Sequence, residues 1–213
     1  MTKISFLNTQ SLLNKFDCIK LDLNLHQSDV ILLAETWIAQ NEEECKRYEL
    51  ENYEVNLNNA GRGKGLATYH RQQFQHTVDL NDDNISMTRI ESTDIDVIAV
   101  YRSQNGSWKT LINNLQDLIN LNKTTLIVAY SICSIEQPKN KLCTYLKDIT
   151  FKQIVKEATH IDGGHIDHAY IINKGNYEAE PDVEIVPKYY SDHDALCFTW
   201  KKMKQFTGNE NHL

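Results

Sequence analysis

Short apolar runs separated by polar turns recur along this chain of 213 residues. Runs of roughly four to eight residues between such turns are typical of buried strands. We expect strands over residues 4–7, 30–33, 65–69, 85–90, 95–100, 125–128, 166–172, 183–186 and 195–200. Apolar residues at helical spacing predict helices over 12–25, 108–121 and 142–155. This mixture predicts an α/β fold in which two sheets pack face to face as a sandwich, with helices outside.

No break along the chain divides it into separate domains. The sequence contains no linker rich in proline or glycine, no repeat and no low-complexity segment. Its length suits one domain of ordinary size. We therefore expect one domain over residues 1–203 and a flexible tail over residues 204–213.

The net charge of −7 is the opposite of what a broad DNA-binding face usually gives. An acidic total does not exclude nucleic acid, because a metal site concentrates carboxylates and local basic patches can still bind phosphates. Arg62 with Lys64, and the tail residues Lys201, Lys202 and Lys204, are two such patches. Solvated surface is the simpler interpretation of both.

The chain also lacks signals for export or membrane insertion. No charged segment followed by a long apolar run opens the sequence, and no apolar run approaches the roughly 20 residues that span a bilayer. The 5 cysteines include no C-x-x-C pair, which favours a reduced compartment. We expect an intracellular protein, in the cytoplasm or nucleus, that does not contact a membrane.

Polar residues follow the first two strand-like runs. Glu35 comes after the run 30–33, where a carboxylate is well placed to hold Mg²⁺. The alternative is a residue in the first turn of a helix. Asn8 ends the first run, and its amide can bind a phosphate oxygen or a metal-bound water. The alternative for Asn8 is a turn before the following helix.

Three later runs carry further candidates at their ends. Tyr101 and Arg102 follow the run 95–100 and can contact a phosphate. Asp192 and His193 precede the last run and can supply one carboxylate on a metal and one imidazole. Asp167 can orient the imidazole of His193 and favour its charged form.

Together and in this order, these fragments resemble the endonuclease/exonuclease/phosphatase superfamily, over about residues 4–200. Abasic-site endonucleases and the endonucleases of non-LTR retroelements are among its members. The resemblance implies a two-sheet α/β sandwich flanked by helices in four layers, and Mg²⁺ or Mn²⁺ as cofactor. It implies the metal ligands Glu35 and Asp192 and the catalytic residues Asn8, Tyr101, Asp167 and His193.

The departure from the family lies at residues 129–132, which read Ala-Tyr-Ser-Ile. Members usually carry Gly-Asp-x-Asn there, whose Asp orients or activates water and whose Asn supports the phosphate. Either Tyr130 and Ile132 replace these two, or one residue is deleted. Losing an acid–base group costs roughly 10²–10⁴ in rate, and a phenol with a pKa of about 10 is a poor base.

Three functions are compatible with this pattern. The first, which we favour, is a nuclease-like phosphodiesterase domain with impaired or lost catalysis and a weakly bound metal, derived from a mobile element, the alternative being a host enzyme. The second is a working Mg²⁺-dependent endonuclease or phosphodiesterase, in which Glu35, Asp192 and His193 suffice or an acid such as Glu136 substitutes. The third is a non-enzymatic module that binds nucleic acid or protein. In the favoured case we expect a monomer whose cleft binds nucleic acid, namely DNA.

Two further motifs are better explained as structural turns. Residues 61–65 resemble a phosphate-binding loop, but no Ser or Thr follows Lys64 and a strand comes next, so a hairpin or loop is favoured. Residues 160–168 contain three histidines and suggest zinc. They have no cysteine partner nearby, and Gly163-Gly164 is typical of a turn into a strand.

Overall fold

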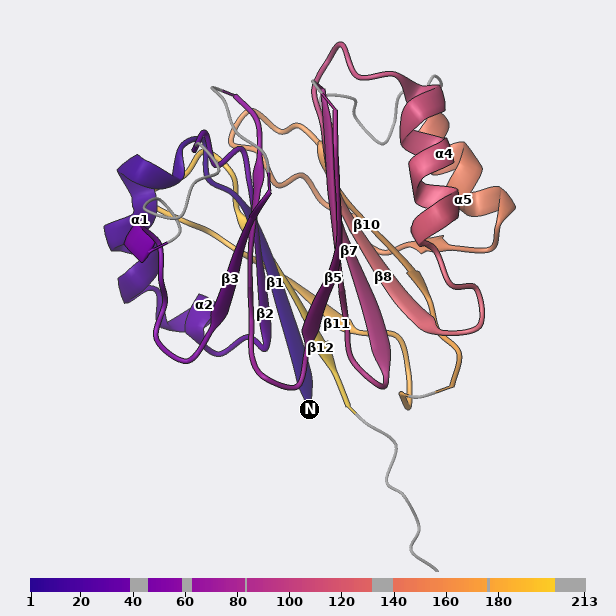
Figure 1. The fold of residues 1–213 in the computed structure, drawn as a ribbon, viewed down its shortest axis with the longest axis horizontal. Helices are drawn as coiled ribbons and strands as arrows, with labels where there is room; N and C mark the ends of the chain where they lie inside the picture. Colours follow the sequence, from indigo (N-terminus) through magenta and orange to yellow (C-terminus); the bar gives the residue numbers. More distant parts are fainter. Residues whose placement is uncertain (39–45, 59–62, 83, 132–139, 176, 202–213) are drawn as a thin grey trace, which may run out of the picture.

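The computed structural model describes residues 1–38, 46–58, 63–82, 84–131, 140–175 and 177–201. Within them, two six-stranded sheets pack face to face, with helices on the outer side of each (Figure 1). In spatial order, the first sheet consists of β11 (Asp182–Val186), β12 (Ala195–Trp200), β1 (Thr2–Asn8), β2 (Val30–Ala34), β4 (Leu66–His70) and β3 (Glu54–Asn58).

The second sheet has the same number of strands. Its spatial order is β5 (Gln75–Asn81), β6 (Ile85–Glu91), β7 (Ile95–Arg102), β8 (Thr124–Ser131), β10 (Asp167–Ile172) and β9 (Lys152–Gln153). Each sheet contains one parallel pair, β1 with β2 and β7 with β8. Parallel neighbours need a crossover, which α1 (Leu12–Leu21) and α2 (Leu23–His26) supply in the first sheet and α4 (Trp108–Leu118) supplies in the second.

The alternation of side chains along the strands divides the core into layers. Ile4 and Phe6 of β1 share the central core with Val97 and Ala99 of β7. The intervening side chains face outward and are covered by helices. The outer layers are formed by Leu12, Phe16 and Ile19 of α1 on one side, and on the other by Leu111, Leu115 and Leu118 of α4 with Leu142 and Leu146 of α5 (Lys141–Asp148).

The predicted sandwich of two sheets with outer helices is confirmed, and each predicted strand is present. Three strands, β3, β5 and β9, were not predicted. Their burial patterns show the reason, because β3 and β5 are largely half-buried and β9 has only two residues. The predicted tail at 204–213 lies outside the described residues.

Two of the three predicted helices end earlier than expected, and the third is divided in two. The helix predicted over 12–25 is two helices, because Asp22 ends the first and its side chain accepts the backbone N–H groups of Asn24 and Leu25 to start the second. The helix predicted over 142–155 is wrong beyond Asp148. Thr150 has a φ of +74°, which a helix cannot accommodate, and the chain then enters β9. The helix predicted over 108–121 stops at Leu118.

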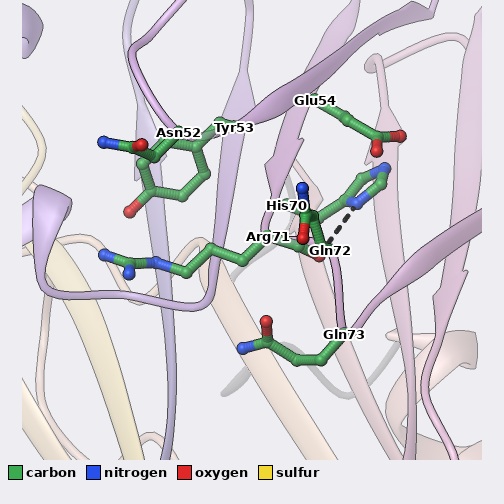
Figure 2. Close-up of a pocket in the computed structure, with 7 residues that line it drawn as sticks. All are labelled: Asn52, Tyr53, Glu54, His70, Arg71, Gln72 and Gln73. Carbon is green, nitrogen blue, oxygen red and sulfur yellow. Dashed lines mark hydrogen bonds between the residues drawn. The ribbon is translucent and has the colours of Figure 1, made fainter.

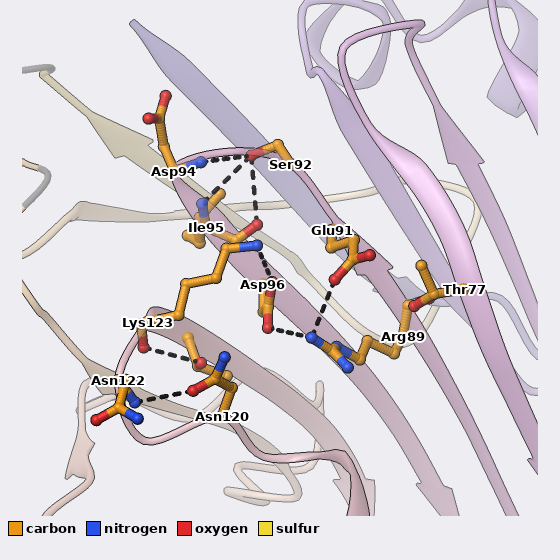
Figure 3. Close-up of polar contacts among 11 residues, drawn as sticks. Thr77, Arg89, Glu91, Ser92, Asp94, Ile95, Asp96, Asn120, Asn122 and Lys123 are labelled. Atoms are coloured by element: carbon orange, nitrogen blue, oxygen red, sulfur yellow. Dashed lines mark hydrogen bonds and ion pairs between the residues drawn. The ribbon is translucent and has the colours of Figure 1, made fainter.

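One end of the sandwich is fixed by a buried ionic cluster. Asp96, near the start of β7, is fully buried and pairs with Arg89 at 2.6 Å and Lys123 at 2.6 Å (Figure 3). Arg89 also contacts Glu91 at 3.0 Å. The cluster ties β6, β7 and the turn before β8 together at the end where β7 and β8 begin.

A hollow of about 450 Å³ lies at this same end, beside the finish of β4 (Figure 2). It is lined by Asn52, Tyr53, Glu54, His70, Arg71, Gln72 and Gln73, which include none of the predicted functional residues. Arg71 lies over the ring of Tyr53 at 5.3 Å.

No helix of the described residues is long and apolar enough to cross a membrane.

Candidate active site

Six strands bring polar side chains to the opposite end of the sandwich. β1, β2, β7 and β8 finish at that end, whereas β12 and β10 begin there because they run antiparallel to β1 and β8. Asn8 is the last residue of β1 and Asp167 the first of β10. Tyr130 of β8 pairs with Tyr101 on one side and with Asp167 on the other. These three residues therefore form one row across the second sheet.

A buried carboxylate holds the imidazole of His193. The Oδ2 atom of Asp167 lies 2.7 Å from Nδ1 of His193, and both side chains are 1% exposed. The hydroxyl of Thr159 donates to the same oxygen. Burial lowers the pKa of His193, but the hydrogen bond and charge of Asp167 outweigh it and raise the pKa above its ordinary value. The imidazole is thus favoured in its charged form.

Glu35 lies at the end of β2, buried beside other site residues. Burial raises the pKa of its carboxyl, although the hydroxyl of Tyr130 and the charge of His193 oppose the increase. Asp192 is close enough for its charge to raise the same pKa. The carboxylate is therefore destabilised by burial, and the hydroxyl of Tyr130 partly compensates.

Tyr130 occupies the centre of the site. Its ring stacks on Tyr101 at 5.7 Å between centroids and meets the edge of His193 at 5.7 Å. Burial and the nearby Glu35 raise the pKa of the Tyr130 hydroxyl well above its ordinary value, and that of Tyr101 as well. The Tyr101 hydroxyl donates to the carbonyl of Gly63. Both phenols are therefore neutral donors and not bases.

The strand β8 runs in unbroken register through Ser131, with Tyr101 opposite Tyr130 and Arg102 opposite Ser131. This pairing is the same whether Tyr130 replaces the residue of the superfamily or one residue is deleted, so both alignments stay open. Ile132, the second replaced position, lies outside the described residues, as does Glu136.

Asp192 faces the site from the segment before β12. Its Oδ2 accepts a hydrogen bond of 2.6 Å from Gln10 and lies 3.4 Å from Nε2 of His160. Its Oδ1, like Nδ2 of Asn8 and Oδ1 of Asp167, is buried and has no hydrogen-bond partner within the described parts of the chain. Buried polar groups are nearly always satisfied, so these atoms are suited to a ligand.

His160 is placed in the site by backbone pairing. It forms an isolated β-bridge with His193, and the backbone N–H of Ile161 donates to the carbonyl of Asp192. The rings of His160 and His193 lie 4.7 Å apart. Among the described residues, His160, Asp192 and His193 form a group whose potential metal-ligating atoms all lie within 4.8 Å of one another. Glu35 does not belong to this group.

The loops that carry these residues have unusual backbone conformations. Gln10, Ser11, Glu35 and Trp37 have positive φ, and in the described residues only Asn52 and Thr150 share this among non-glycine positions. The two loops are joined by backbone hydrogen bonds, including Ser11 N–H to Glu35 at 2.8 Å. Such conformations cost roughly 1–3 kcal/mol each and cluster at functional sites.

The structure brings all six predicted site residues to one end of the sandwich. Arg102 does not join them, because its guanidinium stacks 3.8 Å from the ring of Trp108 on the outer face and donates to Gly106. The glycine-rich segment precedes β4, as expected, although Arg62 lies outside the described residues. Sequence reasoning gave no role to Gln10 or Thr159, whose only signal was proximity to fragments already singled out. His160 belonged to the histidine-rich segment 160–168, which was interpreted as a turn and not as a zinc site.

The structure was compared with known proteins. No protein-family model and no curated protein matches the sequence. An AP endonuclease from Archaeoglobus fulgidus matches in structure with a TM-score of 0.69 at 16% identity, over 94% of this chain and 99% of that one. The 3′ phosphatase NExo from Neisseria, bound to a product DNA hairpin, gives 0.69 at 15% identity, over 94% and 100%.

A third similar structure comes from a mobile element. The endonuclease domain of TRAS1, a telomere-specific non-LTR retrotransposon, gives a TM-score of 0.68 at 10% identity, over 92% of this chain and 96% of that one. All three are members of the endonuclease/exonuclease/phosphatase superfamily. The likeness shows that this chain has the fold of that superfamily.

Proposed function

We propose that the chain is a nuclease-like, metal-dependent phosphodiesterase domain that binds DNA at this end of the sandwich and whose catalysis is impaired. The fold supports the general class, since similar structures include an AP endonuclease and a phosphatase bound to product DNA. The gathered residues support the place. An imidazole in its charged form, carboxylates and unpaired polar atoms suit a phosphate and a divalent cation.

The observation that carries the impairment is the position of Tyr130. Hydrolysis of a phosphodiester needs a group that orients or deprotonates the attacking water. Tyr130 stands between Tyr101 and Asp167 where the family would place that group, and its hydroxyl already donates to Glu35. With its pKa raised above the ordinary value, the phenol cannot accept a proton at neutral pH.

The metal would be held by Glu35 and Asp192. Carboxylate oxygens are the ligands that Mg²⁺ and Mn²⁺ prefer, and the unpaired Oδ1 of Asp192 fits this requirement. The ion would stabilise negative charge on the phosphate oxygens. Burial opposes the charged form of Glu35, so we expect weak binding. Asn8 and His193 would contact the phosphate, and Asp167 would keep the imidazole charged.

Plasmid nicking with Mg²⁺ or Mn²⁺ tests the proposal. Tyr130→Asp restores the carboxylate, and Tyr130→Ala is its matched control because it removes the same ring without adding a base. We expect Tyr130→Asp to nick at least about 10²-fold faster than the native chain and Tyr130→Ala. A second variant carries Gly-Asp-Phe-Asn at residues 129–132. It is made with and without a one-residue insertion and tested in the same nicking assay.

One set of rates would overturn the impairment. The impairment is refuted if the native chain nicks plasmid, if none of the variants with a restored carboxylate nicks faster, and if His193→Ala abolishes the native rate. In that case the chain is a working endonuclease. Binding of an uncleavable DNA duplex by fluorescence anisotropy addresses the third function, since a binding module would hold DNA while every repaired variant stays inactive.

The origin and assembly of the domain belong to the same proposal. The TRAS1 endonuclease domain is similar in structure to 92% of this chain, which supports derivation from a mobile element. We propose that the domain acts as a monomer. Sedimentation at several concentrations tests this, since a mass that rises with concentration would contradict it.

A further inference from the structure

We infer that His160, Asp192 and His193 form a binding site for Zn²⁺ or a similar transition-metal ion. This site differs from the proposed Mg²⁺ site, because it contains two imidazoles and does not include Glu35. Zinc binding does not depend on turnover, and the site can exist in a chain without nuclease activity.

The spacing of the ligand atoms suits zinc. Two ligands bound at about 2.0–2.1 Å to a tetrahedral zinc ion lie roughly 3.3–3.4 Å apart. Nε2 of His160 and Oδ2 of Asp192 are 3.4 Å apart, and the three potential ligand atoms lie within 4.8 Å of one another. Closing a separation of 4.8 Å to about 3.4 Å takes a relative movement of about 1.4 Å (4.8 − 3.4), which two side chains can share.

His193 is already arranged as a zinc ligand. A metal-bound histidine usually donates its other ring N–H to a carboxylate, which fixes the ring and its tautomer. Nδ1 of His193 lies 2.7 Å from Asp167, which leaves Nε2 for a ligand. Asp167 is itself held by the hydroxyl of Thr159. The chain therefore contains a buried carboxylate–histidine pair with a second hydrogen bond behind it.

The Asp192 carboxylate would bind the ion through Oδ2, the oxygen that lies near His160. Its Oδ2 accepts from Gln10 and faces His160, whereas its Oδ1 is buried without a hydrogen-bond partner in the described residues. His160 is 18% exposed and Asp192 is 31% exposed, so the site opens to solvent on this side. An ion can therefore enter without unfolding the sandwich.

The donor set selects against magnesium. Mg²⁺ prefers oxygen ligands in an octahedral arrangement, whereas imidazole suits zinc, copper, iron and nickel. Two imidazoles and one carboxylate are therefore a transition-metal donor set. Because Asp192 is shared with the proposed Mg²⁺ site, zinc and Mg²⁺ would compete for this carboxylate.

Zinc binding changes the protonation of both histidines, because a metal-bound imidazole is neutral. His193 releases its Nε2 proton to water, and His160 moves one proton between its two ring nitrogens. Nδ1 of His160 accepts the backbone N–H of Asp162 at 3.1 Å, so Nε2 carries the proton in the neutral ring. Coordination through Nε2 moves the proton to Nδ1. The carboxylate of Asp162, 3.7 Å from Nδ1, can then receive it as a hydrogen-bond acceptor.

Calorimetry and NMR with Zn²⁺ test the site in the full chain after treatment with a chelator. We expect one zinc ion per chain, binding that persists in millimolar Mg²⁺, and shifts of the ring-nitrogen signals of His160 and His193. Asp167→Asn should weaken zinc binding roughly 10–100-fold, as loss of an outer partner does. His160→Gln should weaken it more, because it removes a ligand.

His165→Gln is the matched control, since it removes a histidine of the same segment that is outside the group. It should bind zinc as the native chain does. Thermal unfolding checks that the variants fold. If His160→Gln does not fold, Asp192→Asn is used in its place. Equal zinc affinity in His160→Gln and the native chain, or ring-nitrogen signals that zinc leaves unmoved, would overturn the inference.

Discussion

The hydroxyl of Tyr130 should stabilise the folded chain because it donates to a buried carboxylate. Tyr130→Phe removes this oxygen and keeps the ring. A hydrogen bond to a charged group contributes about 1.5–3 kcal/mol. Water cannot replace it here, since Tyr130 is 6% and Glu35 is 8% exposed. For a chain of this size the loss corresponds to a fall in Tm of roughly 3–12 °C.

Removing the whole ring should cost more. Tyr130→Ala also loses the stacking on Tyr101 and the contact with His193. Truncating a buried aromatic ring to alanine typically costs about 3–5 kcal/mol. We therefore expect the free energy of unfolding to fall from the native chain to Tyr130→Phe and again to Tyr130→Ala.

The effect of Tyr130→Phe should depend on pH through Glu35. Burial raises the pKa of Glu35 and the Tyr130 hydroxyl opposes this, so the variant raises that pKa further. The penalty on a carboxyl whose folded pKa is raised is absent below the ordinary pKa and grows as pH rises from the ordinary to the folded pKa. The destabilisation by Tyr130→Phe should therefore be larger at neutral pH than near about pH 4.

Urea denaturation of both proteins at the two pH values measures this difference. Tyr53→Phe is the control, because its hydroxyl donates to the neutral carbonyl groups of His26 and Ser28 at the other end of the sandwich. Its cost should be the same at both pH values. A loss for Tyr130→Phe below about 0.5 kcal/mol at neutral pH, or an equal loss at both, would refute a hydrogen bond to charged Glu35.

Three other predictions concern the carboxylates. Asp167→Asn should lower the pKa of His193 in an NMR titration, and an unchanged pKa would contradict the pairing; stability from this pair should be greatest below the ordinary histidine pKa and decline as pH rises through the folded value. Calorimetry should show weak Mg²⁺ binding that Glu35→Ala abolishes, and binding that survives would place the ion elsewhere. Asp96→Asn should lower the free energy of unfolding by about 2–3 kcal/mol. Breaking a fully buried ion pair usually costs about 3–5 kcal/mol. The cost is smaller here because the side chains of Arg89 and Lys123 are each 20% exposed. A loss as small as that of the half-buried control Glu91→Gln would refute it.

The hydrophobic pattern was sufficient to predict the layers of the fold. The runs that become β1, β2, β7, β8, β10 and β12 are continuous and apolar because they are buried on both faces. β3 and β5 were not predicted because their few apolar residues alternate with polar ones and form no continuous apolar run. The end of the helix at Asp148 depends on Thr150 in a left-handed conformation, which the sequence does not mark.

The sequence by itself determined which side chains stand at the ends of the strands, and it showed that no carboxylate adjoins Tyr130 along the chain. Local order along the chain determines both. The tertiary structure alone decided where these side chains point and what they contact. The contact of Tyr130 with Glu35, and that of His160 with Asp192, join residues 95 and 32 positions apart. Such contacts depend on how the two sheets pack and on the register of β8 and β12, which no local pattern encodes.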